Sequence, residues 1–290
     1  MLTDPDFLRT WRVTDRHFTL GQFPLLMGIV NTTPDSFSDG GQFLDPDHAI
    51  EHALRLVAQG ADIIDIGGES TRPGSDPVAA AEQLRRVIPV ISGLSQQSDE
   101  LISIDTTSAD VAREALAAGA HIVNDISGLT FDEQMVPLVA DADCGVICMH
   151  IQGTPKTMQD APCYADVVTD ICRYLEGRLA TLGSAGVDRQ RVVLDPGIGF
   201  GKTAAHNLDI LASIDRLRGL GRPVLIGHSR KRFLEKILGR ELNERTWGTA
   251  GVSVALAAQR VDILRVHDVQ AVRDAVLAWH TVMTAALSPD

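Results

Sequence analysis

Eight short apolar runs rich in Val, Ile and Leu recur along the chain, and a helical pattern follows each of them. The runs cover residues 25–30, 62–66, 101–104, 122–124, 146–149, 192–194, 224–226 and 263–266. They are apolar almost without interruption, as expected for parallel strands that are buried on both faces. Strands that alternate with helices indicate βα units, and eight such units close a barrel. We therefore predict an α/β fold, the (β/α)8 TIM barrel.

Helix signals between the runs support this fold. Asp45 caps a helix that Gly60 ends, and apolar residues recur between them at helical spacing. Thr107 or Ser108 starts another helix, which Gly119 ends.

The first 24 residues follow a different pattern. Trp11 and Val13, then Phe18 and Leu20, flank a polar turn at residues 15–16, which predicts an N-terminal β-hairpin. We expect this extension, residues 1–24, to cover the bottom of the barrel, within a single domain of residues 1–290.

Composition and charge exclude several classes of protein. An apolar fraction of 44% with 22% charged residues is typical of a globular protein and excludes a disordered chain. The net charge of −12 makes nucleic acid and anionic membranes poor partners. No stretch approaches the ~18 uncharged residues of a membrane span and no apolar signal sequence is present, so we expect a cytoplasmic protein. The four cysteines lack the spacing of a disulfide framework or a metal site.

Hydrogen-bonding or charged side chains follow every one of the eight runs. They are Asn31, residues 67–72, Asp105, Asn124 with Asp125, His150, Asp195, residues 229–231, and Arg265 with His267. In a barrel the carboxyl ends of the strands share one face, where the βα loops build the active site. Loops are polar in general, but the recurrence after all eight runs favours a functional site.

The loop after the first run, residues 31–41, is rich in turn-forming residues and yet contains Phe37. A lid over a ligand explains an aromatic residue there, although an ordinary turn with Phe37 packed on the barrel is the alternative. Asn31 and Asp35 offer the hard oxygen ligands that suit Mg²⁺ brought in on phosphate oxygens.

A glycine-rich segment at residues 195–203 resembles a nucleotide-binding loop but fails on spacing. Pro196 stands where a phosphate-binding P-loop needs glycine, so nucleotide binding is not indicated. The glycines instead allow the loop to pass close to a ligand held by Asp195, with Phe200 as an apolar wall.

Basic residues follow the last two runs. Lys231 could be a Schiff-base nucleophile, a phosphate contact or a hydrogen-bond donor to a heterocycle, and we expect Arg230 and Arg232 to lower its pKa. Arg265 and His267 alternate on one strand, so both point the same way and can form an anion pocket. A solvated basic cluster and a buried structural pair are the alternatives.

Two further histidines lie near the ends of the runs. His150 is either catalytic or a strand-end histidine bonded to a backbone carbonyl, and we expect His228 to be structural.

Several segments match one known family, and the chain resembles dihydropteroate synthases over nearly its whole length. They include MGIVNTTPDSFSDGG at residues 27–41, GGESTRPG at 67–74 and DPGIGFGK at 195–202, with shorter matches at 104–106, 124–128, 149–150, 229–231 and 265–268. The resemblance implies a pterin-binding (β/α)8 barrel, usually a homodimer. It also implies an enzyme that joins 6-hydroxymethyl-7,8-dihydropterin diphosphate to p-aminobenzoate and releases pyrophosphate.

The resemblance assigns a pterin pocket to five of these residues. The carboxylate of Asp195 would accept hydrogen bonds from the 2-amino and N3 groups, and Asn124 would both donate and accept. Lys231 would donate to O4 and N5. Asp105 would stabilise positive charge on the ring, and Arg265 would lie against the ring face.

The resemblance also places the diphosphate and the metal. Asn31, Arg265 and His267 would hold the diphosphate, and Mg²⁺ would bind Asn31 and Asp35. Pyrophosphate departure leaves a cation delocalised into the ring, and an arylamine is already a nucleophile, so we expect no dedicated base. The residues expected to be catalytic are Asp105, Lys231, Arg265 and Asn31.

A slot for p-aminobenzoate would be formed by Phe37, Thr71, Pro73, Phe200 and Arg232. Sulfonamides, which mimic this substrate, should compete there. Arg232 departs from the family, which commonly has Ser at this position, so the carboxylate would be held by backbone N–H groups or by Arg232 itself. Thr32 replaces a commoner apolar residue, and we expect this change to be tolerated.

Three other functions remain open at this point. A non-catalytic pterin-binding paralogue would bind pterin diphosphate without turnover. A pterin-binding methyltransferase domain would share the pocket, but intact lid loops and the anion site argue against it. A Schiff-base aldolase would be trapped on Lys231 by borohydride, which we expect to fail.

Overall fold

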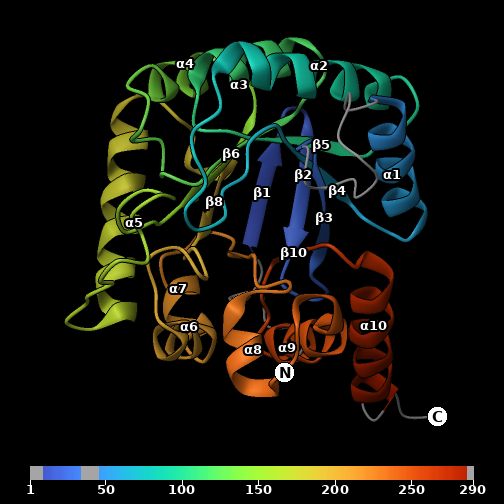
Figure 1. The fold of residues 1–290 in the computed structure, drawn as a ribbon, viewed down its shortest axis with the longest axis vertical. Helices are drawn as coiled ribbons and strands as arrows, with labels where there is room; N and C mark the ends of the chain where they lie inside the picture. Colours follow the sequence, from blue (N-terminus) through green and yellow to red (C-terminus); the bar gives the residue numbers. More distant parts are fainter. Residues whose placement is uncertain (1–8, 34–45, 286–290) are drawn as a thin grey trace.

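The computed structural model describes residues 9–33 and 46–285 and contains a barrel of eight parallel strands (Figure 1). The strands are β3 (Leu25–Asn31), β4 (Ile63–Gly67), β5 (Leu101–Asp105), β6 (Ile122–Asp125), β7 (Gly145–Met149), β8 (Val192–Asp195), β9 (Leu225–Ile226) and β10 (Ile263–Val266). Their order is β8-β7-β6-β5-β4-β3-β10-β9, and a parallel bridge between Leu194 and Val224 closes the ring. Each observed boundary lies within one residue of the predicted one, which confirms the TIM barrel.

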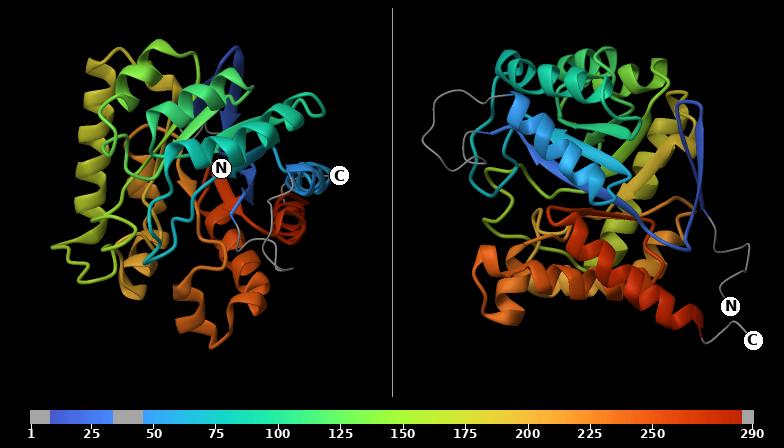
Figure 2. Two further views of the ribbon diagram at one scale, coloured as in Figure 1. Left: turned by 45° about the horizontal axis from the view of Figure 1, so that its top comes forward. Right: turned by 90° about the vertical axis from the view of Figure 1, so that its right-hand side faces the viewer.

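Helices surround the strands on the outside (Figure 2). They are α1 (Pro46–Ala58), α2 (Ala80–Ser95), α3 (Ala109–Ala117), α4 (Met135–Asp141), α5 (Val167–Ser184), α6 (Ala204–Leu211), α7 (Ile214–Arg218), α8 (Arg232–Leu238), α9 (Thr246–Ala258) and α10 (Val269–Ala285). Ser108, not Thr107, caps α3, because its side chain accepts a hydrogen bond from the Val111 N–H. Within residues 9–33 and 46–285, no helix is long and apolar enough to cross a membrane.

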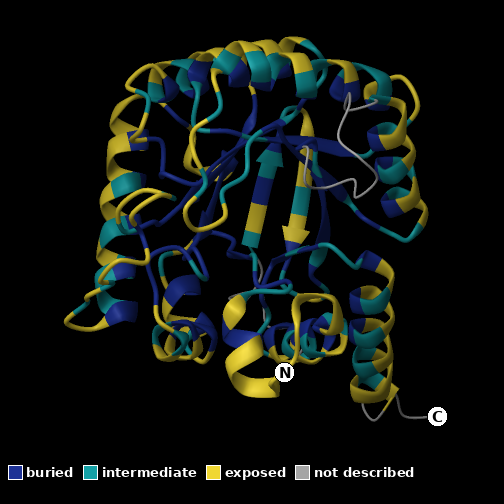
Figure 3. Ribbon diagram, in the orientation of Figure 1, coloured by how far each residue is buried: buried dark blue, intermediate teal, exposed yellow. Residues whose placement is uncertain are grey.

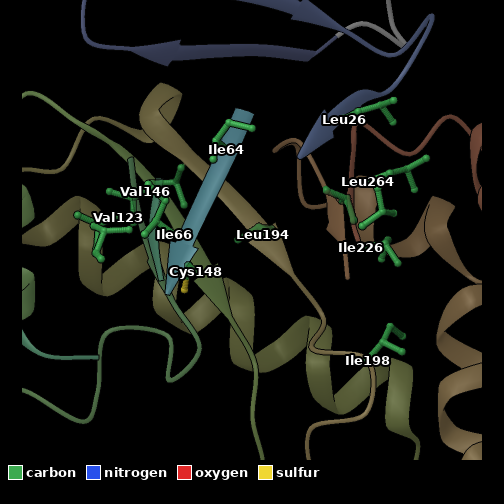
Figure 4. Close-up of a cluster of buried hydrophobic side chains, with 14 of the residues drawn as sticks. Leu26, Ile64, Ile66, Val123, Val146, Cys148, Leu194, Ile198, Ile226 and Leu264 are labelled. Carbon is green, nitrogen blue, oxygen red and sulfur yellow. The ribbon is translucent and has the colours of Figure 1, made fainter. Parts of the chain in front are cut away.

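Alternate side chains of each strand face outward and pack under the helices. Figure 4 labels several of them, including Leu26, Ile64, Val146, Leu194 and Leu264. All five are at most 1% exposed and belong to one cluster with apolar residues of the helices. Because successive side chains of a strand point to opposite faces, the residues between them face the barrel interior.

The N-terminal hairpin closes one end of that interior, as predicted. It consists of β1 (Arg9–Val13) and β2 (Arg16–Leu20), so the turn lies at residues 14–15, one residue earlier than expected. Trp11, Val13 and Leu20 pack against a layer of inward side chains near the strand beginnings: Met27, Ile63, Leu101, Ile122, Ile147, Val193, Leu225 and Ile263. The Trp11 indole N–H donates to the carbonyl of Arg191 at 2.9 Å. The active face must therefore be the opposite end.

Candidate active site

A polar layer lies directly above the apolar floor of the barrel. Moving two residues along a strand keeps a side chain on the same face, so Ile63 is followed inward by Asp65, and Ile263 by Arg265. The same step leads from other residues of the floor to Ser103, Asn124 and Asp195. Figure 3 shows these strands as mostly buried, and only Asp105 and Arg265 among these strands' residues are partly exposed. The strand pattern therefore places polar groups in the centre of the barrel.

Arg265 lies between two carboxylates. Its Nε donates to Asp65 Oδ2 at 2.6 Å, and its Nη2 donates to Asp105 Oδ2 at 2.7 Å. Asp65 is fully buried and also accepts from Asn124 Nδ2 at 3.2 Å. Burial raises the pKa of Asp105 to about 7, although Arg265 opposes this rise. The structure thus brings Asp105, Asn124 and Arg265 together as predicted, through a fourth residue that sequence reasoning missed.

That fourth residue, Asp65, had a recognisable signal. It is one of two charged residues in the apolar run at residues 62–66, the other being Asp62 at its start, and it follows Ile63 at the spacing that keeps both side chains inside the barrel. A buried carboxylate requires a cation or hydrogen-bond donors, and Arg265 and Asn124 supply both.

Asp195 ends β8, and Lys231 lies in the segment that follows β9, the strand next to β8. Burial raises the pKa of Asp195 to about 6, although a 2.7 Å hydrogen bond from the Gly197 N–H and the charge of Lys231 oppose this rise. The Lys231 ammonium lies 4.2 Å from the centre of the Phe200 ring, a cation–π distance. Burial and the nearby Arg265 lower the pKa of Lys231 to about 8.

The expected influence of Arg230 and Arg232 on Lys231 is wrong. Arg230 turns away and binds both carboxylate oxygens of Asp268, at 3.1 and 2.8 Å. Arg232 begins α8 with its side chain exposed to solvent. The guanidinium that acts on Lys231 is that of Arg265, which the sequence places 34 residues away.

His267 follows directly after the end of β10 at Val266, two residues beyond Arg265. Its Nδ1 lies 3.0 Å from the hydroxyl of Ser229. Burial lowers the pKa of His267 to about 3, with a further contribution from Arg230. The imidazole is therefore neutral, and it offers an anion a hydrogen bond but no charge.

The strand register places Asn31 at the same height in the barrel as Asp105. Asn31 pairs with Gly67, and Gly67 pairs with Asp105 on the next strand. A Cβ atom on Gly67 would lie 3.5 Å from Asp105 Cβ and 3.9 Å from Asn31 Oδ1, so Gly67 lies between the two side chains. Asp35 and Phe37, the other predicted residues of this loop, lie outside the described residues. In the part of the chain described, no three His, Cys, Asp or Glu side chains are grouped to hold a metal.

The loop after β4 contains the remaining predicted residues of the aminobenzoate slot. Thr71 is half-buried and Pro73 is exposed, whereas Phe200 is buried. The loop contacts the loop after β7, because the Gly74 N–H donates to the carbonyl of Pro155 at 3.0 Å. A 2.8 Å ion pair between Asp76 and Lys156 joins the same two loops.

The structure shows which groups the side chains of His150 and His228 contact. The ring of His150 lies against the Lys202 ammonium, with 3.0 Å between Nδ1 and Nζ, and burial lowers its pKa to about 3. The imidazole of His228 is buried and its Nε2 lies 2.9 Å from the Ser253 hydroxyl. The environment of His228 is structural, as expected, whereas His150 contacts Lys202, a further residue that sequence reasoning did not place.

Comparison with known proteins agrees with this geometry. Residues 27–267 match the family described as pterin binding enzymes. The chain is 47% identical over 255 residues to the dihydropteroate synthase of Synechocystis sp., covering 88% of each protein. It is 41% identical to the dihydropteroate synthase of Escherichia coli, covering 90% of this chain and 93% of that protein. The chain belongs to the dihydropteroate synthase family.

Solved dihydropteroate synthase structures share the fold. The structure from Xanthomonas albilineans with 4-aminobenzoic acid has a TM-score of 0.88 at 44% identity, covering 95% of this chain and 98% of that one. The structure from Yersinia pestis with a sulfonamide drug complex has a TM-score of 0.89 at 40% identity, covering 95% and 99%. A further X. albilineans structure contains 7,8-dihydropteroate, with a TM-score of 0.83 at 39% identity, covering 94% and 98%.

Proposed function

We propose that this site condenses 6-hydroxymethyl-7,8-dihydropterin diphosphate with p-aminobenzoate to give 7,8-dihydropteroate and pyrophosphate. The observation that carries the proposal is the buried polar layer of Asp65, Asn124, Asp195 and Arg265, with Lys231 beside it. A dihydropterin presents a matching set of donors and acceptors along its edges. The relatives crystallised with 4-aminobenzoic acid and 7,8-dihydropteroate support the same substrates.

Each pterin contact follows from the donor and acceptor roles of the side chains. The Asp195 carboxylate would accept from the 2-amino and N3 groups, with its orientation held by the Gly197 N–H. Lys231 would donate to O4 and N5, and its position is fixed against the Phe200 ring. Asn124 would bind the same edge, oriented by its hydrogen bond to Asp65.

The chemistry requires stabilisation of charge rather than a base. Departure of pyrophosphate would leave positive charge on the pterin, and the Asp105 carboxylate would stabilise it. Arg265 would stabilise the charge on the leaving oxygens, while neutral His267 and the Asn31 amide would each contribute one hydrogen bond. The arylamine would then attack without deprotonation beforehand, and exclusion of water would protect the cation.

The predicted Mg²⁺ remains a proposal. Mg²⁺ is commonly held by one or two protein oxygens together with substrate phosphates and water. Asn31 supplies one such oxygen at the active face, next to Asp105 across Gly67, which fits an ion bound through the substrate diphosphate. When bound, Mg²⁺ would neutralise charge on the leaving diphosphate.

The cytoplasmic location expected from the sequence also stays a prediction.

The aminobenzoate slot is proposed around Phe200, Thr71 and Pro73. The exposed side chain of Arg232 leaves both alternatives for the carboxylate open: the backbone N–H groups that begin α8, or the guanidinium itself.

The experiment that tests the proposal is formation of 7,8-dihydropteroate from the two substrates with Mg²⁺, identified by mass. The product is expected with the wild-type protein. Binding of the pterin diphosphate without product would instead favour the non-catalytic paralogue or the methyltransferase domain.

Pterin binding should weaken as the pH falls. The pKa of Asp195 is raised to about 6, so the carboxylate that accepts two N–H groups is ionised above about pH 6 and lost below it. The Kd of the dihydropterin alcohol, which lacks the titrating diphosphate, should rise about tenfold between pH 7 and pH 5 in calorimetric titrations.

An Asp195→Asn variant is the control for this pH dependence. It should bind weakly throughout and lose the step near pH 6, while any step due to Asp105 near pH 7 should remain. An unchanged profile in the variant would contradict the role of Asp195.

We also propose that the chain forms a homodimer through α8 and α9. Trp247 is 81% exposed and Ile237 52% exposed, and they flank an apolar groove that reaches Gly248 and Gly251. Figure 3 shows exposed segments along α8. A protruding Trp beside a groove on one face is self-complementary, as a twofold interface requires. A second copy of the chain is therefore the proposed occupant.

Gly251→Glu should convert this dimer to a monomer. A Cβ atom on Gly251 would meet nothing within 4 Å outside the adjoining turns of its own helix, so the variant should fold, but it would bury a carboxylate in the interface. The dimer Kd from sedimentation should rise at least about tenfold. Gly177→Glu on α5, equally free of contacts, is the control and should leave the dimer unchanged. Equal behaviour of the two variants would place the interface elsewhere.

A further inference from the structure

Lys202 is a buried basic residue that the reaction described above does not use, and burial lowers its pKa to about 7. It is 3% exposed, and within the described residues it forms no ion pair with a carboxylate. Its ammonium lies 2.8 Å from the carbonyl oxygen of Phe200, 3.0 Å from His150 Nδ1 and 3.4 Å from the carbonyl oxygen of His150. These three acceptors match the three N–H donors of a lysine. Lys202 therefore links the main chain of the loop after β8, at Phe200, to His150 in the loop after β7.

The imidazole of His150 is suited to accept from this ammonium. Burial and the charge of Lys202 keep His150 neutral, because they lower its pKa to about 3. A neutral imidazole whose Nδ1 accepts carries its proton on Nε2. The His150 main-chain N–H in turn donates to the carbonyl of Asp195 at 3.0 Å. Lys202 is thus connected to the strand ends on both sides of the loop.

The loop held by Lys202 is flanked by glycines. Gly199 and Gly201 have φ angles of +84° and +66°, which favour glycine. A Cβ atom on Gly201 would lie 2.6 Å from the carbonyl oxygen of Gln152, and one on Gly199 would lie 3.2 Å from Lys231 Cδ. The backbone therefore passes closely between Lys231 and the loop after β7. The Phe200 side chain packs in a buried cluster with Ile126, Met149, Ile151 and Met158, while hydrogen bonds hold the main chain on either side of it.

Other side chains bind the same loop from its outer side. Gln159 Nε2 donates to the carbonyl of Gly199 at 2.8 Å, and the Tyr164 hydroxyl donates to the carbonyl of Gly201 at 2.8 Å. The carbonyl between them, that of Phe200, is the one that Lys202 binds. The Phe200 ring contacts the Lys231 ammonium, so the tethered loop extends directly into the proposed site.

We propose that Lys202 is a positioning residue that fixes the Phe200 main chain, and with it the Phe200 ring, at the p-aminobenzoate side of the site. The proposal rests on the proposed function, since it assigns the p-aminobenzoate slot to the side of the pocket that Phe200 forms. It differs from a purely structural role because it acts on one substrate more than on the other.

The test is Lys202→Met, which keeps the length and removes the donors. The KM for p-aminobenzoate should rise about tenfold, while the KM for the pterin diphosphate should change less than about twofold. Arg222→Met is the matched control, because Arg222 is also a buried basic residue that donates to main-chain carbonyls, those of Thr10, Gln190 and Val192, at the other end of the barrel. It should lower the Tm without changing either KM.

A double-mutant cycle with Phe200→Leu separates positioning from stability. If Lys202 acts through Phe200, adding Lys202→Met to Phe200→Leu should change the KM for p-aminobenzoate less than about twofold. The proposal would be overturned if the effects of the two substitutions on the KM for p-aminobenzoate multiplied fully in the double variant. It would also be overturned if Lys202→Met lowered the Tm and left the KM for p-aminobenzoate unchanged. If Lys202→Met does not fold, Gln159→Ala, at an exposed residue that binds the same loop, replaces it as the test. A KM for p-aminobenzoate about twofold to threefold higher in this variant supports the proposal, and an unchanged KM overturns it. Absence of dihydropteroate with the wild type would refute the proposed function instead.

Discussion

Replacing Arg265 by methionine is expected to lower kcat/KM for dihydropteroate formation by at least about 10³-fold and the free energy of unfolding by about 3–5 kcal/mol. Both losses have one cause. Arg265 lies between Asp65 and Asp105, at 2.6 and 2.7 Å, and only 19% of its side chain is exposed. Without it, the buried carboxylate of Asp65 and the carboxylate of Asp105 lose their shared cation, and the proposed diphosphate site loses a positive charge.

The stability loss should depend on pH in a defined direction. The pKa of Asp105 is already raised to about 7 with Arg265 present, and removing the cation must raise it further. A carboxyl group with a raised pKa in the folded state binds more protons when folded, so lowering the pH relieves the unpaired charge. Urea unfolding should therefore find the variant less destabilised at pH 6 than at pH 8.

Arg218→Met is the matched control for Arg265→Met. Arg218 also pairs with a fully buried carboxylate, that of Asp262, at 3.6 Å, but at the end of the barrel near the hairpin. The Arg218→Met variant should be less stable than the wild type but should keep the same kcat/KM per folded molecule. A normal kcat/KM in Arg265→Met, measured on folded protein, would remove Arg265 from the mechanism.

Lys231→Met is expected to lower kcat/KM for the pterin diphosphate by about 10²–10³-fold with little change in stability. The variant loses the donor to the pterin acceptors, while the methionine still covers the Phe200 ring. Stability should be kept because burial opposes the charge on Lys231, as its lowered pKa of about 8 shows. Steady-state kinetics and thermal unfolding on the same sample measure both quantities.

Two further variants sharpen this result. Lys231→Arg should not restore activity, since a planar guanidinium cannot replace a compact ammonium in a closed pocket. Lys236→Met on the exposed side of α8 should behave like the wild type. Borohydride should not trap a substrate on Lys231, and trapping would revive the Schiff-base alternative.

The barrel could be predicted from the sequence because its strands are short and apolar almost throughout. That pattern arises only when both faces of a strand are buried, so strand boundaries followed to within one residue. The active face followed as well, because polar residues such as Asp105 and Asp195 come at the carboxyl ends of the strands.

The electrostatic partners could not be predicted in the same way. Asp65 lies inside an apolar run, and its partner Arg265 is 200 residues away, a pairing that only the closed barrel creates. Arg230 and Arg232 are next to Lys231 in sequence, yet one binds Asp268 and the other faces solvent. Neighbours in a turn diverge in space, whereas inward side chains of strands that are not adjacent, here β4 and β10, meet inside the closed barrel.

We expect this pocket to release pyrophosphate from the pterin diphosphate and to transfer the pterinylmethyl group to an arylamine. The most direct measurement is pyrophosphate release with Mg²⁺, with and without p-aminobenzoate, on the wild type and on Lys231→Met. We predict release that p-aminobenzoate stimulates, equal amounts of pyrophosphate and dihydropteroate, and a large loss in the variant. Tight pterin binding without pyrophosphate release would contradict the proposed transfer reaction.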